Sequence, residues 1–96
     1  MLERDYQGKL IKRIKERFPG SVVLKNDPNY IQGFPDLLVL HEDKWAALEC
    51  KRSASESHRP NQDYYIQELG AMSFASFIFP ENEEEVMNAL QRTFES

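Results

Sequence analysis

The feature that most constrains the fold is a pair of short apolar runs joined by a polar turn. Residues 37–40 and 45–48 are apolar, and residues 41–44 between them are polar. Two such runs with a short polar connection predict an antiparallel β-hairpin. Asp36 precedes the first run and Glu49 follows the second. Because the start of one antiparallel strand lies beside the end of the next, we expect these two carboxylates to meet.

The strand period places a lysine beside the same carboxylates. Side chains two positions apart on a strand share a face, so Glu49 and Lys51 point the same way and Cys50 points the opposite way. Two carboxylates about 4 Å apart repel by roughly 4 kcal/mol at an effective dielectric near 20. Either the Lys51 ammonium or a bound divalent cation relieves that repulsion.

A divalent cation at this position suggests a particular reaction. Mg²⁺ prefers carboxylate oxygens, keeps several waters and accepts phosphate oxygens. Such an ion lowers the pKa of its water and neutralises charge on a phosphoryl group. Lys51 could hold the attacking water or the scissile phosphate. The pattern therefore predicts hydrolysis of a phosphodiester.

Glu3 is a candidate third carboxylate, at the start of an amphipathic helix. It could complete the metal shell directly or through water, although acids are common in any first helical turn. Structural explanations stay open for the other residues too. Asp36 could simply begin a strand, Glu49 and Lys51 could form a surface ion pair, and Gln62 could be a solvated helix residue.

Hydrophobic periodicity and breakers predict the remaining elements. They indicate three helices: one over 2–18, one that begins at Pro60 and ends at Gly70, and one that follows a cap at Asn82. They also indicate strands over 21–26 and 73–79, and loops over 27–34 and 52–59. A helix between two strands is a crossover, which requires parallel pairing. The fold class is thus α/β, a mixed central sheet flanked by helices in the order α-β-β-β-α-β-α.

Several polar and aromatic residues carry a structural expectation. His41 lies in the polar turn. The loop over 52–59 is expected to be mobile, and its residues His58 and Arg59 to be solvated, with phosphate contact as the less favoured alternative. Tyr64 and Tyr65 fall at helix spacing, which is typical of core residues.

The composition limits the class of protein. Residues 1–96 fit one domain, and 41% apolar residues argue against disorder. No apolar stretch reaches the roughly 20 residues of a membrane span, and the start lacks the pattern of a signal peptide. The single cysteine, Cys50, excludes an internal disulfide and makes a cysteine zinc site improbable. These features favour the reducing cytoplasm.

The charge is distributed unevenly along the chain. The formal net charge is −4, but residues 1–60 carry 11 Lys/Arg and 9 Asp/Glu, whereas residues 61–96 carry 1 and 7. Several acids of the first part are the candidate metal ligands, and a bound dication would offset part of their charge. Since local potential governs phosphate binding, the acidic total lowers the expectation of a nucleic-acid partner without excluding it.

The ordered motifs resemble a known nuclease group. Asp36 with residues 49–51 has the form PD-(D/E)xK, the pattern of a large nuclease superfamily with a restriction-endonuclease-like core. The longer pattern is similar to small stand-alone members of the VRR-NUC family from phages and bacteria. It comprises Glu3, Gln7, Lys25, Asn26, Gly33, Pro35, Asp36, Glu49, Lys51 and Gln62.

This resemblance implies a metal-dependent DNA endonuclease without a small-molecule cofactor, in a bacterium or a phage-infected host cell. It implies that Asp36, Glu49 and the Cys50 backbone carbonyl bind Mg²⁺ or Mn²⁺ with help from Glu3. Lys51 would serve the nucleophile and Gln62 the phosphate side. Small members resemble Holliday junction resolvases that act as homodimers, and two symmetric cuts in a four-way junction do require two sites.

Three alternatives remain at this point. The chain could be a general nicking or flap endonuclease of a phage, or a catalytically silent nucleic-acid-binding module of the same fold. It could also be an interaction module in which the charges form a surface cluster. The acidic total and the Ser-rich segment after Lys51 depart from the commoner family pattern and leave the substrate open.

Overall fold

Helices and strands follow one another in the order that the sequence predicts. The computed structural model describes residues 2–96. Its elements are α1 (Glu3–Arg17), β1 (Val22–Lys25), β2 (Leu37–His41), β3 (Lys44–Cys50), α2 (Pro60–Met72), β4 (Phe74–Ile78) and α3 (Glu83–Glu95). The predicted class, α/β with a mixed sheet, is confirmed.

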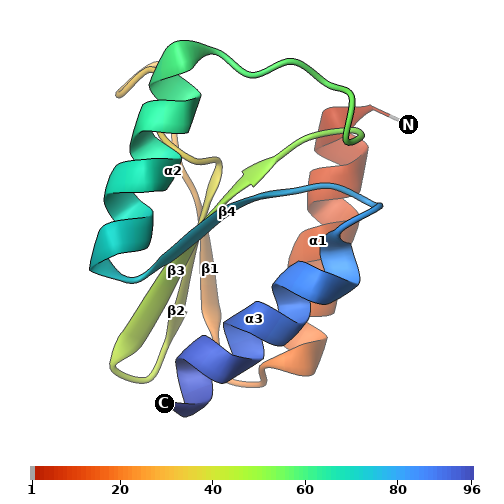
Figure 1. Cartoon of the computed structure of the whole chain (residues 1–96). Coiled ribbons are helices and arrows are strands. Elements are labelled where there is room, and N and C mark those ends of the chain that lie inside the picture. Colours follow the sequence, from red (N-terminus) through yellow and green to blue (C-terminus); the bar gives the residue numbers. More distant parts are fainter. Residues whose placement is uncertain (1) are drawn as a thin grey trace.

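The four strands form one sheet in the order β1-β2-β3-β4. The pairs β1–β2 and β2–β3 are antiparallel, and β3–β4 is parallel because α2 crosses over between them (Figure 1). The predicted hairpin lies at the centre of the sheet, with Leu37 opposite Leu48 in its register. This pairing brings the residues just before β2 beside the end of β3.

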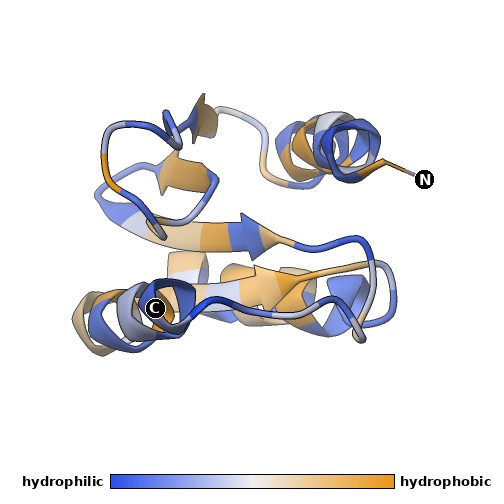
Figure 2. Ribbon diagram, turned by 90° about the horizontal axis from the view of Figure 1, so that it is seen from above, coloured by the Kyte–Doolittle hydropathy of each residue, from blue (hydrophilic) through white to orange (hydrophobic). Residues whose placement is uncertain are grey.

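The hydrophobic core lies between one face of the sheet and the helices α1 and α3. The four-residue repeat of α1 buries Tyr6, Leu10 and Ile14 there. Strand side chains of the same face complete the core: Leu37, Val39, Ala46, Leu48, Cys50 and Ile78. In Figure 2 the strands are largely orange, whereas the helices alternate between orange and blue as amphipathic helices do. Each fully buried aliphatic side chain contributes about 1.5–3 kcal/mol.

The opposite face of the sheet is only partly covered. Helix α2 packs against β3 and β4 on that face, while Val22 and Leu24 of the edge strand β1 stay exposed. No residue of α2 is buried, and the ring of Tyr64 is 55% exposed. The expectation that Tyr64 belongs to the core is therefore wrong, since the core lies on the other side of the sheet.

The central hairpin has a shorter turn than the sequence suggests. His41 pairs with Lys44 in the strand register, so only Glu42 and Asp43 connect β2 to β3. Glu42 adopts a φ of 57°, in the left-handed region. The His41 ring consequently packs edge-on against the Phe94 ring, with centroids 5.2 Å apart, instead of lying in a solvated turn.

Two helix boundaries differ from expectation. Helix α2 continues through Gly70 to Met72, because an isolated glycine costs a helix only about 1 kcal/mol. Asn82 precedes α3 but makes no side-chain cap. Its side chain accepts a hydrogen bond from the Phe79 N–H (2.8 Å) and donates to the Phe77 carbonyl (3.1 Å), which fixes the turn after β4. Among residues 2–96, no helix combines the length and apolar character that crossing a membrane demands.

Candidate metal centre

The backbone before β2 holds Asp36 in a fixed position. The Asn26 N–H donates to the Asp36 carbonyl (2.8 Å), and the Asn26 side-chain amide donates to the Pro35 carbonyl (2.7 Å). Both bonds tie the residues after β1 to the start of β2. The Asp36 side chain is thereby presented at the same sheet end as the last residues of β3.

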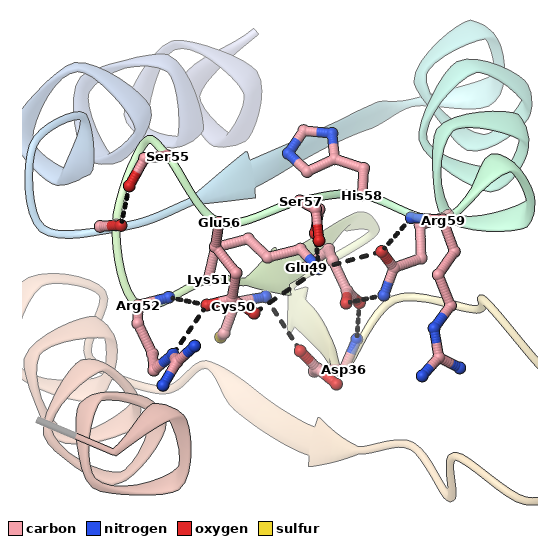
Figure 3. Close-up of polar contacts among 12 residues, drawn as sticks. Asp36, Glu49, Cys50, Lys51, Arg52, Ser55, Glu56, Ser57, His58 and Arg59 are labelled. Atoms are coloured by element: carbon pink, nitrogen blue, oxygen red, sulfur yellow. Dashed lines mark hydrogen bonds and ion pairs between the residues drawn. The ribbon is translucent and has the colours of Figure 1, made fainter.

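Asp36 and Glu49 hold each other through reciprocal hydrogen bonds (Figure 3). Asp36 Oδ2 accepts the Cys50 N–H at 2.9 Å, and Glu49 Oε1 accepts the Asp36 N–H at 3.1 Å. The hairpin geometry expected from the sequence therefore brings the two acids together. Each backbone donor orients a carboxylate and leaves oxygen lone pairs free for another partner.

Cys50 takes part through its backbone and not through its thiol. Its side chain is fully buried on the core face of the sheet. Burial, followed by the charge of Asp36, raises the pKa of the thiol far above its usual range. In a strand, the N–H and C=O of one residue point to the same side. Since the Cys50 N–H points to Asp36, its carbonyl points to that side too.

A third carboxylate comes from α1. Glu3 lies in the first turn of that helix, and one oxygen each of Glu3, Asp36 and Glu49 lies within 4.8 Å of the other two. Three segments distant in sequence thus converge at one end of the sheet. The structure brings together all three acids that the sequence marked as candidates.

The three acids carry more negative charge than their neighbours compensate. Burial, and then the charge of Asp36, raises the pKa of Glu49 to about 8. Burial also raises the pKa of Asp36, although the Cys50 N–H opposes that shift. The pKa of Glu3 is raised by burial and by Asp36. A site of three oxygen ligands with excess negative charge suits a hard divalent cation such as Mg²⁺.

Lys51 lies beside the acids, and Gln62 connects it to them. Glu49 and Lys51 are each only 4% exposed, and no other charged residue in the described range is buried to that extent. Lys51 Nζ donates to Gln62 Oε1 (2.9 Å) and to the Ser57 carbonyl (3.2 Å). Gln62 Nε2 donates to Glu49 Oε2 (2.8 Å). The amide of Gln62 thus fixes both the ammonium and the carboxylate.

The start of α2 positions Gln62. Pro60 occupies the first helical position, and the Arg59 N–H donates to Gln62 Oε1 (3.0 Å). The Gln62 side chain therefore turns back over the helix start and toward the strands. This arrangement excludes the alternative that Gln62 is merely a solvated helix residue.

Three other residues line the same cleft; the sequence did not mark Glu56 and Ser57, and it gave Arg59 phosphate contact only as the less favoured role. Glu56, Ser57 and Arg59 join the acids, Lys51 and Gln62 around a cavity of about 330 Å³. No periodicity singles them out, and Ser57 acts through its backbone carbonyl, which any residue provides. A larger cavity of about 470 Å³ lies at the opposite end of β2, around His41 and Phe94, and none of the three acids lines it.

The loop over 52–59 is anchored at both ends. The His58 ring stacks on the Phe77 ring with centroids 3.8 Å apart, and its Nδ1 lies 3.1 Å from an Asp63 oxygen. At the other end, Glu56 Oε1 accepts hydrogen bonds from the Arg52 N–H and from Arg52 Nε. His58 is exposed, as expected, although its ring stacks on Phe77.

Comparison with known proteins supports the fold. No family model matches the sequence, and no curated protein matches it. A solved structure described as a VRR_NUC domain protein aligns with a TM-score of 0.70 and 14% identity, over 99% of this chain and 89% of that one. A second, described as a VRR_NUC domain, aligns with a TM-score of 0.63 and 23% identity, over 91% and 95%. The predicted resemblance is confirmed at the level of the fold.

Proposed function

We propose that this chain, which shares its fold with VRR_NUC domain proteins, belongs to that nuclease family and is a metal-dependent DNA endonuclease. One observation carries the proposal. Three carboxylates from separate elements meet within 4.8 Å, next to a buried lysine. A site of this kind is unfavourable for folding unless it binds a cation, so its presence argues for a catalytic role over a silent module.

The carboxylates of Asp36 and Glu49 and the backbone carbonyl of Cys50 would hold Mg²⁺ or Mn²⁺, with Glu3 binding directly or through water. When bound, the ion supplies Lewis-acid polarisation of a phosphoryl oxygen and lowers the pKa of a coordinated water. The oxygen-only ligand set fits these hard ions better than zinc.

Lys51 would orient the attacking water and neutralise charge on the scissile phosphate. Its ammonium is a three-proton donor held at the cleft by Gln62 and the Ser57 carbonyl. Attack by water on phosphorus breaks the bond to one bridging oxygen; the water gives up a proton to solvent and the leaving oxygen takes one from solvent, while negative charge lies on the phosphoryl oxygens in the transition state. An ammonium fixed beforehand stabilises that charge without reorganisation. Gln62 positions this ammonium, lines the cleft and would organise the phosphate there.

The preferred substrate is a branched DNA, with resolution of Holliday junctions by a homodimer as the specific activity. A protomer of 96 residues with one such cleft cuts one strand, and a two-fold dimer supplies the second cut. A general nicking or flap endonuclease is the second candidate function. The charge distribution, +2 over residues 1–60 that include the cleft ligands, favours DNA in both cases.

A cleavage assay tests the proposal. Purified protein is incubated with labelled four-way junction, flap, duplex and single-stranded DNA, each with Mg²⁺ and with EDTA. We expect metal-dependent cuts, with the junction cut at symmetric positions. Equal cutting of all substrates would favour the nicking enzyme. No cutting under any condition, with DNA binding retained, would establish the silent module instead.

The oligomeric state is tested separately. Size-exclusion chromatography followed by light scattering, with and without junction DNA, reports the mass of the particle. We expect twice the 11.3 kDa of the chain. A strictly monomeric protein that nevertheless cuts flaps would reject the homodimer and retain the nuclease.

A further inference from the structure

The Glu56 carboxylate occupies a position formed by three cationic or N–H donors at the edge of the cleft. Its Oε1 accepts the Arg52 N–H at 2.7 Å and Arg52 Nε at 3.2 Å. Its Oε2 lies 3.9 Å from Lys51 Nζ. The Glu56 side chain is only 18% exposed, although the loop around it is mostly solvated. Figure 3 shows Glu56 beside Lys51 and Arg52.

These donors are the ones that proteins use to bind phosphate. Contacts to DNA phosphates come mainly from Arg and Lys side chains and from backbone N–H groups. A guanidinium and an ammonium together with an amide also recognise an oxyanion strongly. Arg52 provides two of the three donors, and Lys51, which is 5% exposed in its side chain, provides the buried third.

The same position cannot hold Glu56 and a DNA phosphate together. Glu56 shares the cavity with Glu3, Asp36 and Glu49, and its charge helps to raise the pKa of both Glu3 and Asp36. A phosphodiester entering this cleft would add a further negative charge next to Glu56. Either DNA binds against that repulsion or the carboxylate leaves.

We propose that Arg52 and Lys51 form a subsite for a DNA phosphate next to the scissile one, and that Glu56 fills this subsite in the free protein and is displaced by DNA. The inference rests on the proposed function, because it assumes a nucleic-acid substrate. It assigns a role to the segment between β3 and α2, and it names Arg52 and Glu56 as residues that determine affinity.

The loop geometry allows this exchange. The loop is fixed at Lys51, whose N–H donates to the Ile78 carbonyl (2.9 Å), and at His58. Between them, Glu56 is held by its own N–H bond to the Ser53 carbonyl (3.2 Å) and by the contacts that a phosphate would replace. The Ala54 N–H donates to Glu81 Oε2 at 3.3 Å, and Glu81 does not line the cleft. Release of Glu56 thus requires movement of a short exposed segment and no change in the sheet.

The matched pair Glu56→Gln and Glu81→Gln tests the inference. Each variant removes one negative charge. Glu56 lies within the loop, and Glu81 contacts the loop through the Ala54 N–H, but only Glu56 lines the cleft. Affinity for labelled junction and duplex DNA is measured by fluorescence anisotropy with Ca²⁺ in place of Mg²⁺. We expect Glu56→Gln to tighten binding about fivefold and Glu81→Gln to change it less than about twofold.

Arg52→Ala in the Glu56→Gln background identifies the subsite. We expect it to abolish the gain and to reduce the slope of log affinity against log salt by about 1, the loss of one phosphate contact. Equal effects of the two single variants would overturn the inference, as would an unchanged salt slope. Glu56→Gln retains a side-chain oxygen that can accept the Arg52 N–H, so we expect this variant to fold as the wild-type protein does. Circular dichroism of each variant checks the folding.

Cleavage in Mg²⁺ separates this inference from the proposed function. Tighter binding by Glu56→Gln without cleavage by any variant would support the phosphate subsite and reject the nuclease. Cleavage by every variant, with Glu56→Gln equal to Glu81→Gln, would support the nuclease and reject the subsite. Absence of both binding and cleavage in the wild-type protein would reject both.

Discussion

Two groups of three acids in this molecule differ in how their charges are compensated. In the first turn of α3, Glu83 accepts hydrogen bonds from Arg13 Nε (2.6 Å) and from the Tyr6 hydroxyl (2.9 Å), and Glu84 pairs with Arg17 at 3.3 Å. These contacts join α3 to α1. Glu83 and Glu84 are therefore paired with cations, and all three acids, Glu85 included, lie at a helix start that favours negative charge.

The second group, Glu3, Asp36 and Glu49, has the opposite character. It is partly or fully buried, and Lys51, the cation it shares, donates its hydrogen bonds to Gln62 and Ser57 instead of to these acids. Burial and mutual repulsion raise the pKa of each acid, and that of Glu49 to about 8. The comparison teaches that acids paired with cations can join two helices, whereas acids brought together without a paired cation keep their charge available for a ligand.

The largest predicted effect is on DNA cleavage, and it concerns Lys51, the lysine beside the second group of acids. Lys51→Ala should reduce cleavage by about 10²–10⁴-fold, because it removes the ammonium from the cleft and leaves the core unchanged. Lys44→Ala, at the other end of the same hairpin, is the control and should cut at the wild-type rate. Initial rates on the preferred DNA with saturating Mg²⁺ are the measurement. Wild-type cleavage by Lys51→Ala would remove this residue from the mechanism.

Bound Mg²⁺ should stabilise the folded protein only through the second group of acids, Glu3, Asp36 and Glu49. Mg²⁺ at 100 times its dissociation constant should add about 2.7 kcal/mol to the free energy of unfolding. Asp36→Asn should lose most of this gain and should be slightly more stable than wild type without metal, since it removes repulsion at Glu49. Glu83→Gln should keep the gain. Thermal unfolding with and without Mg²⁺ is the measurement, and a marked loss of metal-free stability in Asp36→Asn would indicate a structural ion pair.

Stability and metal affinity should depend on pH in opposite directions. The folded-state pKa of Glu49, about 8, exceeds the ordinary value of 4.5. Between these values the folded protein binds more protons than the unfolded chain, so metal-free stability falls as pH rises toward 8. Apparent Mg²⁺ affinity should rise about tenfold per pH unit between pH 6 and 8, because one proton must leave, and level off above. Calorimetric titration with Mg²⁺ across this pH range measures the affinity, and Glu49→Gln should remove its dependence on pH.

The smallest effect is expected at the paired group. Glu83→Gln weakens the contacts with Arg13 and Tyr6, whose pKa values this carboxylate helps to raise. Because the Arg13 side chain is 43% exposed, the loss should be only about 0.5–1 kcal/mol in the free energy of unfolding. Urea denaturation measures this, and cleavage should be unchanged. Reduced cleavage would show that the junction of α1 and α3 also controls the position of Glu3.

The sequence predicts the parts of the fold and site that local pattern determines. The hairpin follows from two apolar runs, and its antiparallel pairing brings Asp36 to Glu49. The strand period correctly puts Lys51 on the same face as Glu49 and directs the Cys50 side chain into the core. These inferences need only the geometry of one strand pair.

Other features depend on tertiary contacts, and the sequence does not reveal them. Asn82 has the usual residue type for a helix cap, but bonds to Phe77 and Phe79 compete for its side chain. Helix α2 continues past Gly70 because β4 packs beneath it. Glu56 reaches the cleft through an irregular loop, for which neither the helical nor the strand period gives a direction.

Cys50 gives the site an internal chemical reporter. It is the only cysteine of the chain, it has no exposed surface, and it lies between the residues that supply the carboxylate and the ammonium. A thiol reagent can reach it only when the core around it opens, either because α1 moves off the sheet or because the end of β3 separates from its neighbours, so the rate of alkylation measures how often this part of the core opens. Occupancy of the cleft by a cation would slow this reaction, even in a variant that no longer turns over substrate.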